Sequence, residues 1–187
     1  RQVHRMLREV PDCLFIVDEA YMDFADESVL SLVDDFDNLI VLRTCSKAIG
    51  LAAIRIGFAV AGEKITRAIR SVKSPYNVNT VSQKIGEAVF ADPEFLMHAA
   101  KKIISSREHL YKGLLALHAR YRGFDEVYES ATNFVFIRTK YAKELYEGLL
   151  ARSIAIRFMG GYLRITAGTQ EENKAVLTAL EELVKEY

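Results

Sequence analysis

The sequence lacks net charge, because 25 Lys and Arg residues balance 25 Asp and Glu residues. Without an excess of either sign, bulk electrostatics gives no reason to expect nucleic acid or an anionic membrane surface as a partner. Long apolar runs are also missing, since none approaches the roughly 20 residues that a membrane-spanning helix needs. Residues 1–9 lack the apolar core of a signal peptide. We therefore expect a cytoplasmic protein with neither a membrane nor a nucleic-acid partner.

Cysteine is scarce as well. Cys13 and Cys45 are the two cysteines, and both lie in or beside apolar stretches. Buried free thiols in a reducing compartment are expected rather than a disulfide. The four histidines lie on expected helix faces, and neither they nor the cysteines have the spacing of metal ligands. The sequence therefore predicts no metal site.

Apolar side chains, in contrast, are plentiful. They make up 50% of the 187 residues, which is ample for a hydrophobic core. The length allows one domain or two small ones, and the sequence has no internal repeat and no low-complexity segment. A folded, globular chain is expected.

Two short, fully apolar runs, Cys13–Val17 and Leu39–Leu42, predict strands that are buried on both faces. Polar groups follow both runs, and these are Asp18, Glu19, Tyr21, Thr44, Ser46, Lys47 and Arg55. In an open α/β sheet, ligands lie outside the carboxyl ends of the strands. We therefore expect the reactive groups of the protein at this edge of a mostly parallel sheet.

The remaining pattern predicts alternating helices and strands. Helices are expected over 1–9, 28–33, from 63, over 82–90, 93–119 and 142–151, and from the capping-box sequence Thr169-Gln-Glu-Glu172. Further strands are expected over 54–61, 134–137, 154–156 and 162–166. Residues 74–79 are the strongest linker candidate, because Pro75 stops a helix and its neighbours are polar. The second half of the chain is typical of a small α+β domain.

Five motifs resemble, in order and spacing, the histidinol-phosphate aminotransferases, which are fold-type I pyridoxal-phosphate enzymes. They are Val17-Asp-Glu-Ala-Tyr21, Thr44-Cys-Ser-Lys-Ala-Ile-Gly50, Arg55-Ile-Gly-Phe58, Pro75-Tyr-Asn-Val-Asn79 and Leu163-Arg-Ile-Thr-Ala-Gly-Thr169. Nothing matches the long N-terminal part of that family, so the resemblance implies a C-terminal portion of such an enzyme. It implies that 1–74 complete a large α/β/α cofactor-binding domain, 75–122 form a hinge and long connecting helices, and 123–187 form the small α+β domain.

The resemblance also implies roles for the polar groups at the strand ends. Lys47 holds the aldehyde of pyridoxal 5'-phosphate and acts as the catalytic base. Asp18 faces the ring nitrogen and Tyr21 donates to the ring oxygen, while Thr44, Ser46 and Arg55 bind the phosphate. Taken alone, the same residues have simpler interpretations. Asp18 and Thr44 can cap turns, Tyr21 can pack, and Lys47 can lie on the surface. Glu19 is expected to be structural.

Arg164 lies in an expected strand whose neighbouring side chains face a core, so its charge needs an anion partner. The resemblance implies that it binds the acid group of the substrate, and an internal salt bridge is the alternative. Arg157 resembles a second substrate-facing arginine, although the connection 158–161 is shorter than in many family members. Asn77, Asn79 and Asn133 lie near motif positions, where asparagines mostly serve the backbone.

The implied reaction converts L-histidinol phosphate and 2-oxoglutarate into imidazole-acetol phosphate and L-glutamate, a step of histidine biosynthesis. The implied partners are the small-molecule amino donor, the 2-oxo acid and a second copy of the chain in a homodimer. Two alternatives stay within the superfamily, an aromatic-amino-acid aminotransferase and a threonine-phosphate decarboxylase. A third is that this portion is inactive alone and serves only as a folding or dimerisation unit.

Overall fold

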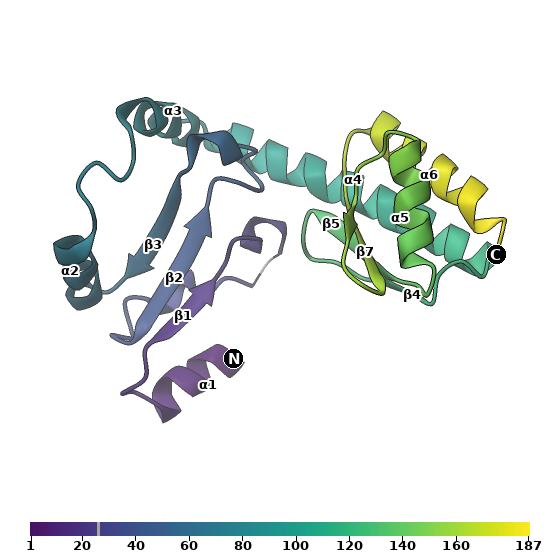
Figure 1. Cartoon of the computed structure of the whole chain (residues 1–187). Helices are drawn as coiled ribbons and strands as arrows, with labels where there is room; N and C mark the ends of the chain where they lie inside the picture. Colours follow the sequence, from purple (N-terminus) through teal and green to yellow (C-terminus); the bar gives the residue numbers. More distant parts are fainter. Residues whose placement is uncertain (26) are drawn as a thin grey trace. The chain divides into compact units, whose positions relative to one another are not determined.

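The chain forms two compact units, Arg1–Ala99 and Ala100–Tyr187. Figure 1 shows the computed structural model. The structure describes residues 1–25 and 27–187. The division between the units falls inside 75–122, the stretch that the sequence predicts as hinge and connecting helices. The assignment of these stretches to a large and a small domain stays a prediction.

The N-terminal unit contains a three-stranded sheet in the order β1-β2-β3 (Figure 1). The strands are β1 (Phe15–Asp18), β2 (Leu39–Thr44) and β3 (Gly57–Ala61). β1 and β2 are parallel, whereas β3 is antiparallel to β2. The two apolar runs therefore do form neighbouring parallel strands, and their carboxyl ends meet at one edge. The prediction that both strands are buried on both faces is wrong for β1, in which Ile16 is 60% exposed.

The expected strand over 54–61 is shorter than predicted. Residues Ala52–Ile54 form a 3-10 turn, and Arg55 has a positive φ of 57°, which a strand cannot contain. The strand begins only at Gly57, where an added Cβ would lie 3.0 Å from the Arg43 carbonyl oxygen. A glycine here thus allows close approach of the two backbones.

One face of this sheet is covered by α1 (Gln2–Glu9) and the segment after β1, with a core of Leu7, Val33, Leu39 and Val41. That segment contains the 3-10 turns Met22–Phe24 and Leu30–Leu32, the second within the expected helix over 28–33. The prediction that both cysteines are buried is wrong for Cys13, which is exposed. The strand begins two residues later than expected, so Cys13 belongs to the turn before β1 and its amide donates to Val10 O at 3.1 Å.

Three helices follow the sheet, α2 (Glu63–Val72), α3 (Thr80–Phe90) and α4 (Pro93–Arg120). The predicted linker separates the first two helices, because α2 ends before Pro75 and Asn79 is the N-cap residue of α3. The Asn79 side chain accepts a hydrogen bond from Ser82 N at 2.9 Å, which is the usual N-cap role of asparagine. None of the described helices is long and apolar enough to cross a membrane.

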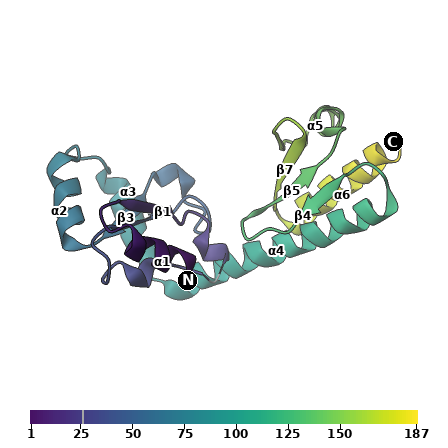
Figure 2. The same ribbon diagram turned by 90° about the horizontal axis from the view of Figure 1, so that it is seen from below.

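The C-terminal unit contains an antiparallel sheet in the order β4-β5-β7-β6. Its elements are β4 (Glu126–Tyr128), β5 (Phe134–Arg138), α5 (Ala142–Ala151), β6 (Arg157–Phe158), β7 (Tyr162–Thr166) and α6 (Gln170–Val184). Figure 2, seen together with Figure 1, places α5, α6 and the later part of α4 beside this sheet. Leucines from all three helices pack with the inward side chains of β5 and β7 in one core.

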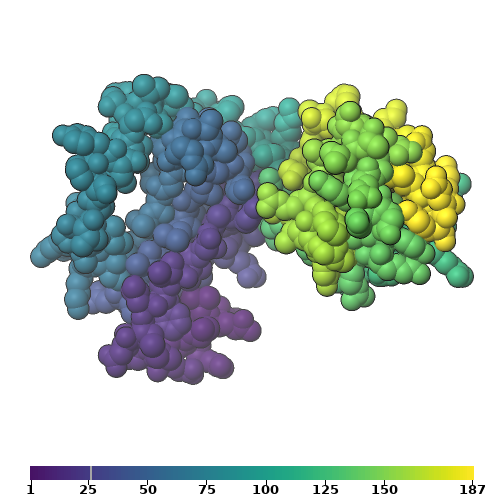
Figure 3. Space-filling view, viewed as in Figure 1, coloured from purple at the N-terminus to yellow at the C-terminus, as the bar shows by residue number. Residues whose placement is uncertain are grey.

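The last helix begins as the sequence predicts. Thr169 accepts a hydrogen bond from Glu172 N, and the Glu172 carboxylate accepts one from Thr169 N at 2.7 Å, so the capping box is complete. α6 packs directly against α5 in the space-filling view (Figure 3). The contact is close because Gly148 leaves room for the Leu183 side chain, which lies 2.6 Å from where a Cβ would be built.

The predicted strand over 154–156 is wrong. Ser153 has a positive φ of 61°, and Ile154 N bonds back to Leu149 O at 2.9 Å, so these residues complete the end of α5. The apolar side chains Ile154 and Ile156 pack against the core without strand pairing. Pairing begins at Arg157 in β6, and the three-residue strand β4 was not predicted at all.

Candidate active site

The carboxyl ends of β1 and β2 carry the first group of candidate residues. The two strands are in parallel register, with Asp18 opposite Leu42, and Glu19 N continues the ladder by donating to Leu42 O at 2.9 Å. Asp18 therefore ends β1 at the same edge at which Thr44 ends β2. Ser46 and Lys47 follow Thr44 directly, so the structure brings these predicted residues to one edge of the sheet.

Lys47 and Tyr21 come from different strand ends and meet. The Lys47 Nζ lies 5.4 Å from the centre of the Tyr21 ring, within the range of a cation–π contact. Both side chains are half-buried. The structure thus places an amine and a phenol next to each other beside the Asp18 strand end.

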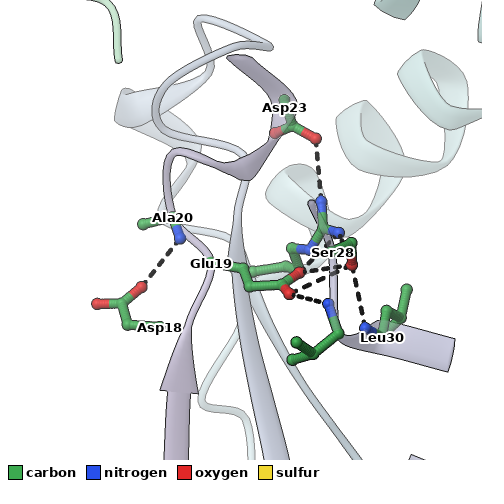
Figure 4. Close-up of polar contacts among 8 residues, drawn as sticks. Asp18, Glu19, Ala20, Asp23, Ser28 and Leu30 are labelled. Carbon is green, nitrogen blue, oxygen red and sulfur yellow. Dashed lines mark hydrogen bonds and ion pairs between the residues drawn. The ribbon is translucent and has the colours of Figure 1, made fainter. Parts of the chain in front are cut away.

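Asp18 makes the turn-capping contact that was the simpler interpretation. Its Oδ1 accepts a hydrogen bond from Ala20 N at 2.9 Å, and its side chain points away from that of Glu19 (Figure 4). The Asp18 side chain is exposed. A carboxylate has two oxygens and about four lone-pair positions, so capping leaves capacity for a second partner.

The candidate phosphate ligands Thr44, Ser46 and Arg55 lie at the end of β2 and in the loop that leads to β3. Thr44 Oγ1 accepts a hydrogen bond from Ser46 N at 3.1 Å, which is the capping role considered for Thr44. Its hydroxyl hydrogen stays available for donation. Arg55 is exposed and uses one N–H to bind Ala52 O at 2.9 Å, out of the five that a guanidinium offers.

A salt bridge behind this edge was missed at the sequence level. Glu19 is 1% exposed, in agreement with its expected structural role, and its Oε2 lies 2.8 Å from Arg43 Nη2. Arg43 follows Leu39 and Val41 at two-residue spacing and so shares their face of β2. A charge on the core face of an apolar strand is the signal that could have revealed this pair.

Arg164 and Arg157 lie directly opposite each other on β7 and β6. The Arg164 side chain is flanked by the buried Leu163 and Ile165, as predicted, and its guanidinium lies 4.9 Å from the Phe134 ring centre. Its Nε is buried without a hydrogen-bond partner, and none of the ion pairs among the described residues involves it. The internal salt bridge is therefore not seen within the described part of the chain, and the role of Arg164 in binding an external anion stays a prediction.

The other polar candidates serve the backbone or the surface. Asn79 caps α3, Asn77 accepts from Lys73 Nζ at 3.1 Å, and the Asn133 carbonyl accepts from Ala167 N at 2.9 Å. Among the described residues, no group of three or more His, Cys, Asp and Glu side chains could hold a metal ion.

The fold and the strand-end residues define a class of protein. A lysine amine, a phenol, a carboxylate, two hydroxyls and a guanidinium at the carboxyl ends of parallel strands form a donor set that suits a phosphorylated aldehyde with a basic ring. These strand-end residues therefore fit pyridoxal phosphate.

Residues 1–180 match the family model described as Aminotransferase class I and II. The chain belongs to this family of pyridoxal-phosphate-dependent proteins, as the five motifs predicted. Its fold is correspondingly fold type I, with mixed α/β architecture.

Two curated relatives are named histidinol-phosphate aminotransferase. A histidinol-phosphate aminotransferase of Clostridium novyi (strain NT) is 40% identical over 174 residues, which are 90% of this chain and 48% of the relative. Histidinol-phosphate aminotransferase 1 of Carboxydothermus hydrogenoformans is 40% identical over 178 residues, 92% of this chain and 49% of the relative. The chain therefore spans about half the length of the curated relatives it matches.

Solved structures share the fold. The histidinol-phosphate aminotransferase from Clostridium acetobutylicum matches all of this chain and 59% of its own, with a TM-score of 0.88 and 20% identity. The L-threonine-O-3-phosphate decarboxylase from Porphyromonas gingivalis matches 98% of this chain and 59% of its own, with a TM-score of 0.83 and 26% identity. The Sinorhizobium meliloti histidinol-phosphate aminotransferase, solved in complex with pyridoxal-5'-phosphate, has a TM-score of 0.81 at 24% identity and is matched over 53% of its chain.

Proposed function

We propose that this chain is the catalytic-lysine half of a pyridoxal-phosphate-dependent aminotransferase that acts on L-histidinol phosphate and 2-oxoglutarate. The observation that carries the proposal is Lys47 Nζ held over the Tyr21 ring at the carboxyl ends of parallel strands. The substrate assignment is supported by relatives at 40% identity that are named histidinol-phosphate aminotransferase. The products are imidazole-acetol phosphate and L-glutamate.

Pyridoxal phosphate, when bound, supplies an electron sink for the negative charge that develops on the substrate carbon. The chain's own residues do the remaining work. Lys47 Nζ would hold the aldehyde, and as a free amine it would take the proton from the amino-bearing carbon of the substrate. Asp18 would keep a proton on the ring nitrogen, and Tyr21 would donate its hydroxyl hydrogen to the ring oxygen. Thr44, Ser46 and Arg55 would hold the cofactor phosphate.

Arg164 and Arg157 bind the acid groups of both substrates. A phosphate monoester and a dicarboxylate share an anionic end, so one pair of guanidiniums can orient each of them in turn. The cross-strand position of the two arginines and the unpartnered Arg164 Nε support this assignment.

A second copy of the chain, in a homodimer, is the expected protein partner, and sedimentation of the full-length protein tests it.

A threonine-phosphate decarboxylase is the second candidate function. The observation in its favour is the L-threonine-O-3-phosphate decarboxylase structure, whose likeness to this chain covers 98% of it at 26% identity. The two activities are separated by substrate. L-histidinol phosphate with 2-oxoglutarate gives L-glutamate, whereas L-threonine-O-3-phosphate releases carbon dioxide.

Reductive trapping tests the proposal. The full-length protein is mixed with pyridoxal phosphate, reduced with borohydride and digested, and the modified lysine is identified by mass spectrometry. We expect modification of Lys47, its loss in Lys47→Ala, and a fall in transamination rate of at least about 10²-fold, the usual contribution of a catalytic base. Lys73→Ala is the matched control, since Lys73 is exposed in the same unit. Modification that is spread over surface lysines and persists in Lys47→Ala contradicts the proposal.

The isolated 187-residue chain answers a separate question. If the chain alone is modified at Lys47, the strand ends suffice to capture the cofactor. If only the full-length protein is modified there, the chain alone is the inactive folding or dimerisation unit that was the third alternative.

A further inference from the structure

Arg43 joins the two strand ends that carry the site. It lies on β2 immediately before Thr44, and its guanidinium contacts three side chains of the segment that follows β1. These are Glu19, Asp23 and Ser28, which Figure 4 labels. Nη2 lies 2.8 Å from Glu19 Oε2 and 2.9 Å from Ser28 Oγ, and Nη1 lies 3.1 Å from Asp23 Oδ1. The contacts therefore tie β2 to the turn in which Tyr21 lies.

The two carboxylates that bind Arg43 flank Tyr21 at equal spacing. Glu19 precedes Tyr21 by two residues and Asp23 follows it by two. Both ends of the turn are thus attached to one guanidinium, while the Tyr21 ring lies against the Lys47 ammonium. A shift of Arg43 would move the turn and with it the ring.

The Glu19 carboxylate has several partners besides Arg43. It is 1% exposed and accepts hydrogen bonds from Val29 N at 2.6 Å and Ser28 Oγ at 2.9 Å, in addition to the Arg43 contact. A buried carboxylate is tolerated only when its oxygens are satisfied in this way. Asp23 lies at the exposed side, so its contact can be removed without leaving a buried charge.

We propose that Arg43 is a positioning residue that, through Glu19 and Asp23, holds the Tyr21 ring against Lys47 Nζ. The proposal rests on the proposed function, since it assigns a role toward the reacting amine. A planar guanidinium is required because two separate carboxylates are bound by its two terminal nitrogens. A lysine at this position offers one nitrogen in place of the two that bind Glu19 and Asp23.

The test measures the acetylation rate of the Lys47 amine before any cofactor is added. The full-length apoprotein is treated with trace acetic anhydride, and the acetylation rate of Lys47 is divided by that of the exposed Lys73. In Asp23→Ala and in Arg43→Lys we expect this ratio to rise by about two- to fivefold, the range for loss of one cation–π contact. After cofactor loading, kcat should fall by roughly tenfold, within the range known for small misplacements of reacting groups, while the substrate KM stays unchanged.

The matched control is Val33→Ala, which removes a buried side chain from the core of the same unit without touching the Arg43 contacts. Its acetylation ratio should equal that of the wild type even where its unfolding midpoint is lower. An unchanged ratio in both Asp23→Ala and Arg43→Lys, or an equal rise in Val33→Ala, overturns the positioning role. Failure of pyridoxal phosphate to modify wild-type Lys47 instead overturns the proposed function, and the acetylation ratios still decide the positioning role.

Discussion

Lys47 lies in a short loop that is closed by backbone hydrogen bonds between residues 45–47 and residues 50–51. Gly50 N donates to Lys47 O at 3.1 Å, and Leu51 N donates to Cys45 O at 3.0 Å. Gly50 has a φ of 72°, a left-handed conformation that glycine adopts without steric cost. The lysine is therefore presented by a short, hydrogen-bonded turn, which limits the positions that its ammonium can reach.

The two cysteines should react at very different rates. Cys13 is exposed, whereas Cys45 is fully buried, and burial, with a smaller contribution from the Asp23 charge, raises the pKa of the Cys45 thiol above its ordinary value. Less thiolate then forms at Cys45 near neutral pH. We expect iodoacetamide to modify Cys13 first and Cys45 only after urea unfolding, as mapped by mass spectrometry. Equal rates in the folded protein would contradict this assignment.

At the scale of elements, the N-terminus of α6 depends on one threonine. Thr169 accepts a hydrogen bond from Glu172 N and completes the capping box after β7. Thr169→Ala should lower the free energy of unfolding by about 1 kcal/mol, measured by urea denaturation. Thr169→Ser keeps the hydroxyl and serves as the control. A loss as large in Thr169→Ser as in Thr169→Ala would show that the cap is not the cause.

Residues just after α4 bind α6 through Glu181. Tyr121 donates to its carboxylate at 2.9 Å, and this hydrogen bond, with Lys185 and Arg120 nearby, lowers the pKa of Glu181 below its ordinary value. Because the folded-state pKa is depressed, the stabilisation is present above the ordinary glutamate pKa and is lost as the pH falls through the folded value.

Tyr121→Phe removes the largest cause of this shift. We expect the pKa of Glu181 to move upward toward its ordinary range and the acid-induced loss of stability to become smaller, as followed by NMR titration of the Glu181 side chain. Tyr111→Phe, a substitution within α4, is the control. An unchanged Glu181 titration in Tyr121→Phe would assign the shift to the neighbouring cations instead.

At the scale of the whole molecule, each unit has its own core. Leu145 is fully buried in the core of the C-terminal unit, whereas Lys47 belongs to the N-terminal unit. Leu145→Ala should lower the stability of the C-terminal unit by about 2–5 kcal/mol. Below the unfolding temperature of the variant, borohydride modification of Lys47 should equal that of the wild type. Loss of that modification at temperatures at which the variant is folded would mean that the site depends on both cores.

Local patterns of the sequence were enough for most elements. The apolar runs of β1 and β2, the Pro75 stop before α3 and the capping box of α6 all act over a few residues, so each is visible in a short window. Two of the errors came from backbone conformations that side-chain patterns do not predict. Positive φ at Arg55 and Ser153 shortened one expected strand and removed another.

The candidate site, too, was predictable from the sequence only in part. Polar groups after two apolar runs located the candidate edge, while the roles of Lys47, Asp18 and Arg164 came from the resemblance of the five motifs to a family. The contact of Lys47 with Tyr21 and the attachment of Arg43 to Glu19 join residues about 25 positions apart. The sequence by itself determined most of the elements and the set of candidate residues, since periodicity and residue type are local properties. Only the tertiary structure decided which of them meet, because parallel pairing of β1 and β2 is what brings distant strand ends to one edge.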